Sequence, residues 1–223
     1  MCGRFTLTTE FDRLAEHFSF RAANVSHSPR YNISPSQSVL TIIDHEGEHR
    51  AGLLRWGLIP SWAKDSTIGN RMINARAETV AEKPSFRRAL QKRRCLVLAD
   101  GFYEWRKEGR TKTPMFITLK TREPFAFAGL WETWKPPTGD PVHSCTIITT
   151  SPNSLMATIH DRMPVILPHT AESLWLDRTV ADPQALLPLL TPYAAELMEA
   201  YAVSPLVNSP RNDALACIEP LES

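Results

Sequence analysis

The sequence predicts a single α+β domain spanning residues 1–223, with mixed strands and flanking helices. Three observations lead to this prediction. Short runs that favour strands crowd the middle of the chain, and the last part is mostly helical. Strands and helices do not alternate strictly, as they would in a parallel doubly wound sheet. The 18 prolines and nine glycines are spread throughout, and no low-complexity block, repeat or linker divides the chain.

Local patterns define the first elements. Apolar residues at helical spacing indicate a helix within residues 8–20, with Thr8 or Thr9 as its N-cap. Prolines bound an expected loop at residues 28–35. The elements expected next are strands at 38–43 and 52–58 with a turn at 45–47 between them, a loop at 60–70, and a short helix within 79–90.

Strand signals dominate the middle of the chain, and helical ones dominate its end. The expected strands are 95–99, 102–106, 115–119, 125–131 and 145–150, with a hairpin turn at 107–110. The expected later elements are short helical turns at 154–159, an extended run at 162–167, helices at 171–176, 183–190 and 192–201, and a final extended stretch with Val203 and Val207.

Composition argues against several functional classes. Hydrophobic residues make up 43% of the 223, which is ample for a substantial core, and the net charge of +1 gives no overall basic signature. Nucleic-acid contact would therefore need a local patch. The four cysteines are widely spaced without a CxxC pair, and no GxGxxG or Walker loop is present. We expect no metal and no organic cofactor.

No segment resembles a targeting signal or a membrane span. The start lacks the apolar run of a signal peptide, and no stretch approaches the roughly 18 apolar residues of a membrane helix. We therefore expect a cytoplasmic protein with reduced thiols and no membrane partner.

The Met1-Cys2 start carries the most specific chemistry. If Met1 is removed, Cys2 presents an amine and a thiol on adjacent carbons. The amine can form an imine with an aldehyde, and the thiol can then close a thiazolidine ring. Reference pKa values of about 7.7–8 for the amine and about 8.5 for the thiol suit neutral pH. Taken alone, a cysteine at position 2 is more often an accident of the start of the chain.

Three further residues suit roles in acid–base chemistry or positioning. Glu104 shares a strand face with Phe102, where burial would raise its pKa, although an exposed carboxylate fits the pattern equally. His160 lies between two expected elements, as a catalytic or an ordinary capping histidine would. Asn74 can both donate and accept a hydrogen bond, but it could equally cap a turn.

Scattered arginines and tryptophans are candidates for strand binding. The arginines at positions 4, 30, 76, 87 and 162 could converge as phosphate ligands. Trp56 and Trp62 could stack on bases, although the core is the commoner place for tryptophan.

These segments together resemble the SRAP family, the SOS response-associated peptidases or abasic-site-processing proteins. Each motif is weak alone, but they occur in order over essentially the whole chain. The matching stretches are MCGRF at 1–5, RYNISP at 30–35, WGLIPSW at 56–62, INARAET at 73–79, RCLVLADGFYEW at 94–105, FAGLW at 127–131, IHDRMP at 159–164 and VNS at 207–209.

The resemblance implies a barrel-like sheet core and a covalent thiazolidine crosslink between Cys2 and an abasic site in single-stranded DNA. It implies that Cys2 is the nucleophile, that Asn74 positions the reacting groups, that Glu104 transfers protons and takes part in removing Met1, and that His160 assists sugar ring opening. It also implies that Arg4, Arg76 and Arg162 contact phosphates, that Pro35 and Trp62 splay the bases, and that Thr149 lines the abasic pocket.

The family's paired tryptophans appear here as Ser61-Trp62, so the expected stacking wedge is reduced to one ring. A monomer is expected, with replication-fork proteins as candidate partners. Two alternatives stay open. One is an N-terminal-cysteine amidohydrolase or peptidase that acts on other proteins. The other is a non-covalent single-strand-binding module.

Overall fold

A computed structural model describes residues 2–21 and 25–221, and in it the long middle strands close into a barrel. Antiparallel pairings join these strands in the order β4, β3, β6, β9 and β10. A short parallel pairing of β10 with β4 closes the ring. The strands are β3 (Ser38–His45), β4 (Glu48–Trp56), β6 (Arg94–Ala99), β9 (Phe125–Trp134) and β10 (Val142–Thr150).

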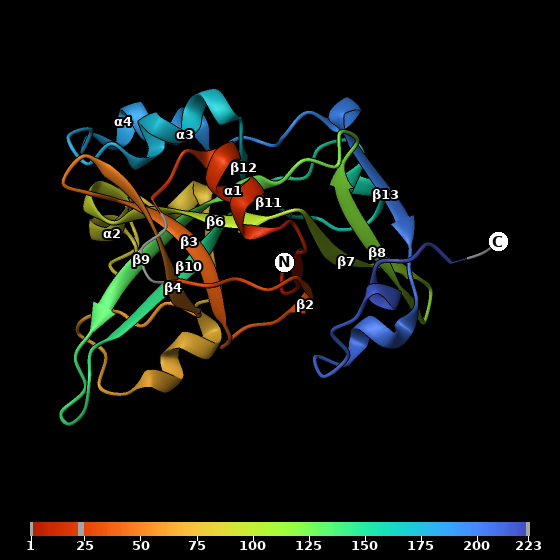
Figure 1. Cartoon of the computed structure of the whole chain (residues 1–223), viewed down its shortest axis with the longest axis horizontal. Coiled ribbons are helices and arrows are strands. Elements are labelled where there is room, and N and C mark those ends of the chain that lie inside the picture. Colours follow the sequence, from red (N-terminus) through yellow and green to blue (C-terminus); the bar gives the residue numbers. More distant parts are fainter. Residues whose placement is uncertain (1, 22–24, 222–223) are drawn as a thin grey trace.

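A second, antiparallel sheet stands beside the barrel, in the order β13, β8, β7, β1 and β2. Figure 1 shows the barrel strands on the left, this sheet on the right and the N-terminal segment between them. The start of the chain is thus placed at the junction of the two sheets. Its strands are β1 (Phe5–Leu7), β2 (Arg30–Ile33), β7 (Gly101–Glu108), β8 (Thr111–Leu119) and β13 (Met198–Ala202).

Short strands and helices complete the α+β architecture that the sequence predicts. The short strands β5 (Asn74–Arg76), β11 (Met163–Pro164) and β12 (Ile166–Leu167) extend the barrel sheet. The α-helices are α1 (Phe11–Phe18), α2 (Arg87–Lys92), α3 (His169–Leu176) and α4 (Pro183–Leu186). The 3-10 turns are η1 (Ser66–Arg71), η2 (Ala77–Thr79), η3 (Met156–Thr158), η4 (Leu187–Leu189), η5 (Ala195–Leu197), η6 (Pro205–Asn208) and η7 (Leu215–Cys217).

The barrel interior is packed tightly enough to require a glycine. Val97 of β6 and Phe127 of β9 lie opposite each other and are fully buried. A Cβ at Gly129 would lie 2.8 Å from Sγ of Cys95 and 2.9 Å from a methyl of Val97. Real side-chain contacts are longer than this, so β9 and β6 can approach only because position 129 has no side chain.

The turn predicted at residues 45–47 is confirmed as the β3–β4 hairpin. Its two loop residues, Glu46 and Gly47, both have positive φ, 58° and 82°. Two-residue hairpin loops with positive φ match the right-handed twist of the strands that they join. The hairpin in turn pairs Ser38 with Arg55 at its far end, next to the Trp56–Gly57 corner.

Two predictions about secondary structure are wrong. Residues 192–201 were expected to be helical, but β13 occupies 198–202 and pairs with β8 along its whole length. Residues 28–35 were expected to be a loop, but β2 occupies 30–33 and pairs with β1. In both places the partner strand lies far away in sequence, and its backbone hydrogen bonds outweigh the local preference.

The ends of two other elements also differ from expectation. Neither Thr8 nor Thr9 caps α1, because both bind Asp100: their amides and hydroxyls donate to its carboxylate over 2.5–3.0 Å. The N-cap is Glu10, without a side-chain hydrogen bond. The final stretch is not extended throughout, since Val207 lies in η6. None of the helices in the described part of the chain is long and apolar enough to cross a membrane.

A buried carboxyl on α3 makes stability depend on pH. Burial raises the pKa of Glu172 from 4.5 to about 7, against the opposing effect of His169, whose Nδ1 is 2.9 Å from its Oε2. The folded state therefore holds a proton that the unfolded chain has lost, and this group's contribution to stability falls as pH rises from about 4.5 to 7.

Glu172→Gln is expected to remove that dependence. Relative to the variant, the wild type should lose about 1–3 kcal/mol of unfolding free energy between about pH 5 and about pH 8. Urea unfolding at both pH values measures the difference. A gap between the two proteins that stays constant with pH would contradict the assignment.

Candidate active site at the N-terminal cysteine

Cys2 lies fully buried just before β1, where the two sheets meet. Its Sγ is 3.9 Å from the carbonyl oxygen of Arg4. Burial, together with the nearby Glu104 carboxylate, raises the pKa of the thiol well above its ordinary range. At neutral pH the sulfur therefore keeps its proton, and a base must accept that proton when the sulfur reacts. Met1, which the resemblance implies is removed, lies outside the described residues.

Glu104 is the carboxylate positioned near this thiol. Alternation along β7 places Phe102 in the main core and Tyr103 in a second core on the opposite face, as predicted. The Glu104 side chain, on the Phe102 side, is 4% exposed. Burial raises the pKa of the Glu104 carboxyl toward neutral pH. A carboxyl with such a pKa is suited to accept a proton and return it.

His160 comes from the loop after η3 and points toward Glu104. Its Nε2 is 3.9 Å from Glu104 Oε2, and its Nδ1 is 3.1 Å from the Arg162 amide nitrogen and 2.9 Å from Asp161 Oδ1. One tautomer cannot make both Nδ1 contacts, because the amide needs a lone pair there and the carboxylate needs a proton. The Asp161 side chain is exposed whereas the amide is held by the chain, so Nδ1 accepts in the neutral ring and the proton sits on Nε2.

Asn74 presents an amide with unused hydrogen-bonding capacity. It is the first residue of β5 and lies opposite Ile147 of β10. Both Oδ1 and Nδ2 are shielded from solvent, and neither has a hydrogen-bond partner among residues 2–21 and 25–221. A buried polar atom left unpaired costs about 1–3 kcal/mol, so an amide with both ends unpaired is suited to a ligand that satisfies them.

Thr149 and Arg76 lie side by side on paired strands. Thr149 is fully buried on β10 and lies opposite Arg76 of β5. Between Asn74 and Arg76, Ala75 points into the core while Arg76 is exposed. Residues 74–76 are extended, and this short strand presents a buried amide and an exposed cation two residues apart.

The side chain of Arg162 contacts both β10 and the turn after β5. Its Nη2 donates to the carbonyl oxygen of Thr149 over 2.7 Å. Its guanidinium also forms a bidentate ion pair with Glu78. An electrostatic interaction links Cys2 to Glu104, and contacts run from Glu104 through His160 and Arg162 to Thr149, which lies opposite Arg76 of β5. The structure thus brings five of the predicted residues close to the strand that bears Asn74 and Arg76.

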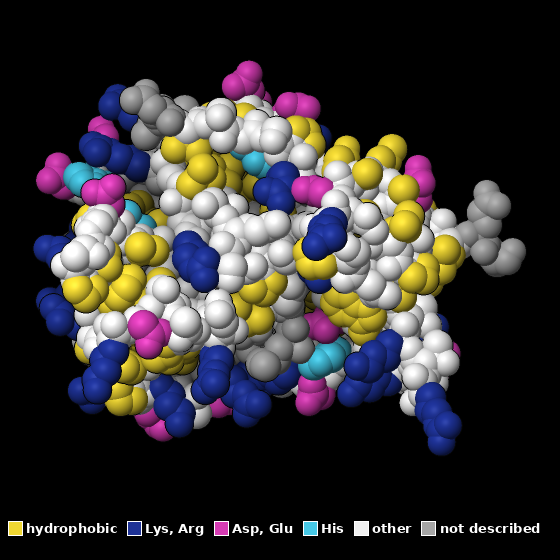
Figure 2. Space-filling model, turned by 90° about the horizontal axis from the view of Figure 1, so that it is seen from below, with side chains coloured by type: hydrophobic (Ala, Val, Ile, Leu, Met, Phe, Trp, Pro, Cys, Tyr) yellow, Lys and Arg dark blue, Asp and Glu magenta, His cyan; other side chains and the backbone are white. Residues whose placement is uncertain are grey.

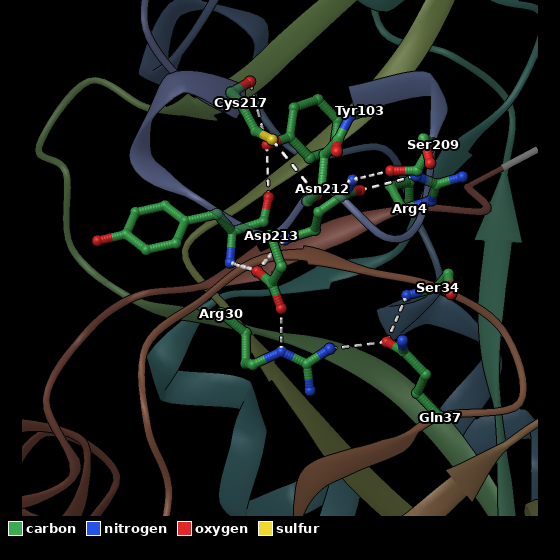
Figure 3. Close-up of polar contacts among 11 residues, drawn as sticks. Arg4, Arg30, Ser34, Gln37, Tyr103, Ser209, Asn212, Asp213 and Cys217 are labelled. Atoms are coloured by element: carbon green, nitrogen blue, oxygen red, sulfur yellow. Dashed lines mark hydrogen bonds and ion pairs between the residues drawn. The ribbon is translucent and has the colours of Figure 1, made fainter. Parts of the chain in front are cut away.

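Arg4 is tied to the interior of the second sheet. Its Nη1 donates to Asn32 Oδ1 and to the carbonyl oxygen of Val207, each over 2.7 Å. Its guanidinium also lies 5.9 Å from the centre of the Trp105 ring. Figure 3 shows Arg4 within a network that links β2 to the segment around residues 209–217. Arg4 thus has a structural role, and its phosphate contact stays a prediction.

Trp62 lines a separate surface groove. The groove has a volume of about 550 Å³, and Lys64, Asn70 and Arg71 also line it. Trp62 is 59% exposed, unlike Trp56, which is fully buried. The chain after Pro35 reaches the same groove, because the Ser36 hydroxyl donates to Asn70 Oδ1 over 3.2 Å.

Basic and acidic side chains are interspersed on the surface. Figure 2 shows Lys and Arg side chains spaced along the lower part of one face, with a histidine and acidic side chains between them. Within residues 2–21 and 25–221, no group of three or more His, Cys, Asp or Glu side chains is placed to hold a metal ion.

Sequence reasoning missed Glu78 and Asp100. Glu78 pairs with a residue 84 positions away, and Asp100 gathers Thr6, Thr8 and Thr9 from more than 90 positions away. Both lie inside stretches that matched the family pattern, INARAET and RCLVLADGFYEW. That match was the available signal, but it assigned no role to either carboxylate.

Comparisons with known proteins place the chain in one family. The family model described as SOS response associated peptidase (SRAP) matches residues 1–210. Abasic site processing protein YoqW of Bacillus subtilis (strain 168) is 55% identical over 222 residues, 98% of this chain and 99% of that protein. Abasic site processing protein HMCES of Gallus gallus is 31% identical over 265 residues, 100% of this chain and 78% of that protein. A crystal structure of a Bacteroides thetaiotaomicron protein superimposes with a TM-score of 0.90 at 28% identity, covering 99% of this chain and 100% of that one.

Proposed function

Because this chain belongs to the SRAP family, we propose that it senses abasic sites in single-stranded DNA and captures them covalently through Cys2. The observation that carries the proposal is that the buried Cys2 thiol lies near the buried Glu104 carboxyl, which in turn lies 3.9 Å from Nε2 of His160. Relatives that match 98% of the chain are named abasic site processing proteins.

The proposed reaction needs the terminal amine of Cys2, freed by removal of Met1. The amine adds to the aldehyde carbon of the ring-opened sugar and expels water, which leaves an imine. The thiol sulfur then bonds to the same carbon, and its proton passes to the imine nitrogen, which closes a thiazolidine. The ring carbon is no longer part of a C=O or C=N bond, so it does not acidify the neighbouring C–H. The thiazolidine therefore blocks β-elimination of the 3′ phosphate and protects the strand from cleavage.

Each residue of the site has a proposed role in these steps. Glu104 relays the thiol proton and also takes part in removing Met1. The Nε2 proton of His160 assists opening of the sugar ring, and the Asn74 amide holds the reacting groups. Thr149 lines the pocket for the missing base. Arg4, Arg76 and Arg162 contact phosphates, while Pro35 and Trp62 splay the flanking bases.

The proposal is tested by mixing protein of verified N-terminal sequence with an oligonucleotide that carries one abasic site. A band that survives denaturant is expected with the abasic single strand and not with the intact strand. A complex that always falls apart in denaturant would favour the non-covalent module. Turnover of an amide substrate by the Met1-free protein, without a crosslink, would favour the amidohydrolase.

Arg76→Ala is expected to weaken reversible single-strand binding and to flatten its salt dependence. A lost phosphate contact should reduce the slope of log affinity against log salt by about 0.7, because fewer counterions are released. Titrations at several salt concentrations measure the slope. Arg178→Ala, an exposed arginine just beyond α3, is the control and should leave it unchanged. If the slope in the Arg76 variant equals that of the wild type, Arg76 does not contact a phosphate.

A further inference from the structure

Glu78 holds the side chain of Arg162 in one orientation. It lies in η2, directly after β5, and its two carboxylate oxygens accept from Nη1 and Nη2 of Arg162 over 2.6 and 2.9 Å. A two-point contact of this kind fixes both the position and the plane of a guanidinium. The Arg162 side chain is only 14% exposed, whereas that of Glu78 is 50% exposed.

A second anchor fastens Arg162 to the barrel. Its Nη2 also donates to the carbonyl oxygen of Thr149, and Thr149 is a fully buried residue of β10. The guanidinium is thus bound from two directions, by the turn after β5 and by a barrel strand. The strand before this turn, β5, pairs with β10, since Thr149 lies opposite Arg76. These contacts therefore fix the position of the Arg162 guanidinium.

The backbone amide of Arg162 contacts the candidate catalytic histidine, His160. Its amide donates to His160 Nδ1 over 3.1 Å, which leaves Nε2 to carry the ring proton toward Glu104. The tautomer and the direction of the ring therefore depend on where that amide sits. Only Asp161 separates the two residues, so a shift of Arg162 moves the amide relative to the ring.

From these contacts we infer that Glu78 is a positioning residue for His160 and acts on it through Arg162. Glu78 does not touch the reacting atoms. Its carboxylate fixes the Arg162 side chain, the fixed side chain holds the backbone, and the amide selects the tautomer with the proton on Nε2. What this implies for crosslinking rests on the proposed function, whereas what it implies for the tautomer does not.

A competing role for Glu78 has a different signature. A carboxylate seated on a guanidinium occupies the place where a phosphate could bind. If Glu78 merely competed with DNA for Arg162, its removal would tighten DNA binding and leave the chemical step alone. If Glu78 is instead a positioning residue, its removal should slow the chemical step even at saturating DNA. Glu78 is the better residue to change, because Arg162 itself is a proposed phosphate contact.

The first measurement uses DNA-free protein, so that it does not depend on the proposed function. Long-range proton–nitrogen NMR spectra distinguish the two histidine tautomers, and a His160→Gln variant identifies the His160 signals. In wild-type protein the neutral ring should carry its proton on Nε2. In Glu78→Ala the signals should move toward a mixture of tautomers. Unchanged His160 signals in that variant would overturn the inference, whatever the reaction.

The second measurement is the single-turnover rate of crosslinking at saturating abasic single strand. Glu78→Ala should be at least about fivefold slower, with an affinity equal to or tighter than that of the wild type. Glu82→Ala removes the same charge from an exposed position four residues away and should react at the wild-type rate. A Glu78→Ala rate within twofold of wild type would overturn the inference, and tighter binding alone would assign Glu78 as a competitor. If the alanine variant does not unfold cooperatively, the isosteric Glu78→Gln gives the same test in the same direction.

Discussion

A protein with one uncleavable residue inserted before Cys2 is expected to form no crosslink with an abasic strand. The insertion turns the reactive amine into a peptide nitrogen, which cannot form an imine with the aldehyde. Reversible binding should survive, because the arginine and tryptophan contacts are untouched. A denaturing gel, run with and without borohydride, measures the outcome, and mass spectrometry verifies the N-terminus. A stable adduct from this blocked protein would place the nucleophile on a lysine or on another cysteine.

Two substitutions at Cys2 separate the roles of the amine and the thiol. Cys2→Ala keeps the amine, so it should form only an imine, whose adduct survives denaturation after borohydride reduction and not before. Cys2→Ser can close an oxazolidine, which hydrolyses more readily, so its adduct should be short-lived. Equal adduct lifetimes for the wild type and the serine variant would show that the sulfur does not close the ring.

Glu104→Gln is expected to slow crosslinking by about 10²-fold or more, the usual contribution of a positioned acid or base. Glutamine keeps the shape and one acceptor oxygen but cannot take the proton that the buried Cys2 thiol must give up. Affinity for the abasic strand should stay near that of the wild type, so the loss should lie in the chemical step. If Glu104 also removes Met1, mass spectrometry should find Met1 retained in part of the variant protein.

The matched control for this loss is Glu108→Gln, on the same strand. Glu108 is 59% exposed and pairs with Arg106 at the surface. It should crosslink at the wild-type rate once its N-terminus is processed. If the Glu104→Gln protein with Met1 fully removed also reacted at the wild-type rate, Glu104 would have no role in the chemical step.

Local patterns predicted the parts of the fold that depend on neighbours in sequence. The period of two along β7 placed Glu104 on the face of Phe102, and the Glu46-Gly47 turn supplied the positive φ values of a hairpin. The strand β13 was missed because Met198–Ala202 has a helical pattern, and only its pairing with β8 makes it extended. Thr8 and Thr9 were misassigned as caps because Asp100 lies about 90 positions away.

The site was predictable only as a set of residue types. The motifs singled out Cys2, Glu104 and His160, and the structure brings them together. Their sequence separation left no local signal for the distances between them. The Glu78–Arg162 pair could not be foreseen, because opposite charges 84 positions apart have many other partners to choose from. The contacts of Arg4 with Asn32 and Val207 could not be predicted either, because these partners lie 28 and 203 positions away in sequence.

The contact between Arg4 and Val207 joins residues 203 positions apart. During synthesis Val207 is therefore added long after Arg4. The segment that carries Cys2 cannot reach its final arrangement until the chain through Val207 has left the exit tunnel. A product truncated between these two residues would keep Cys2 but lack this contact, so the proposed capture chemistry is expected only from a chain that extends through Val207.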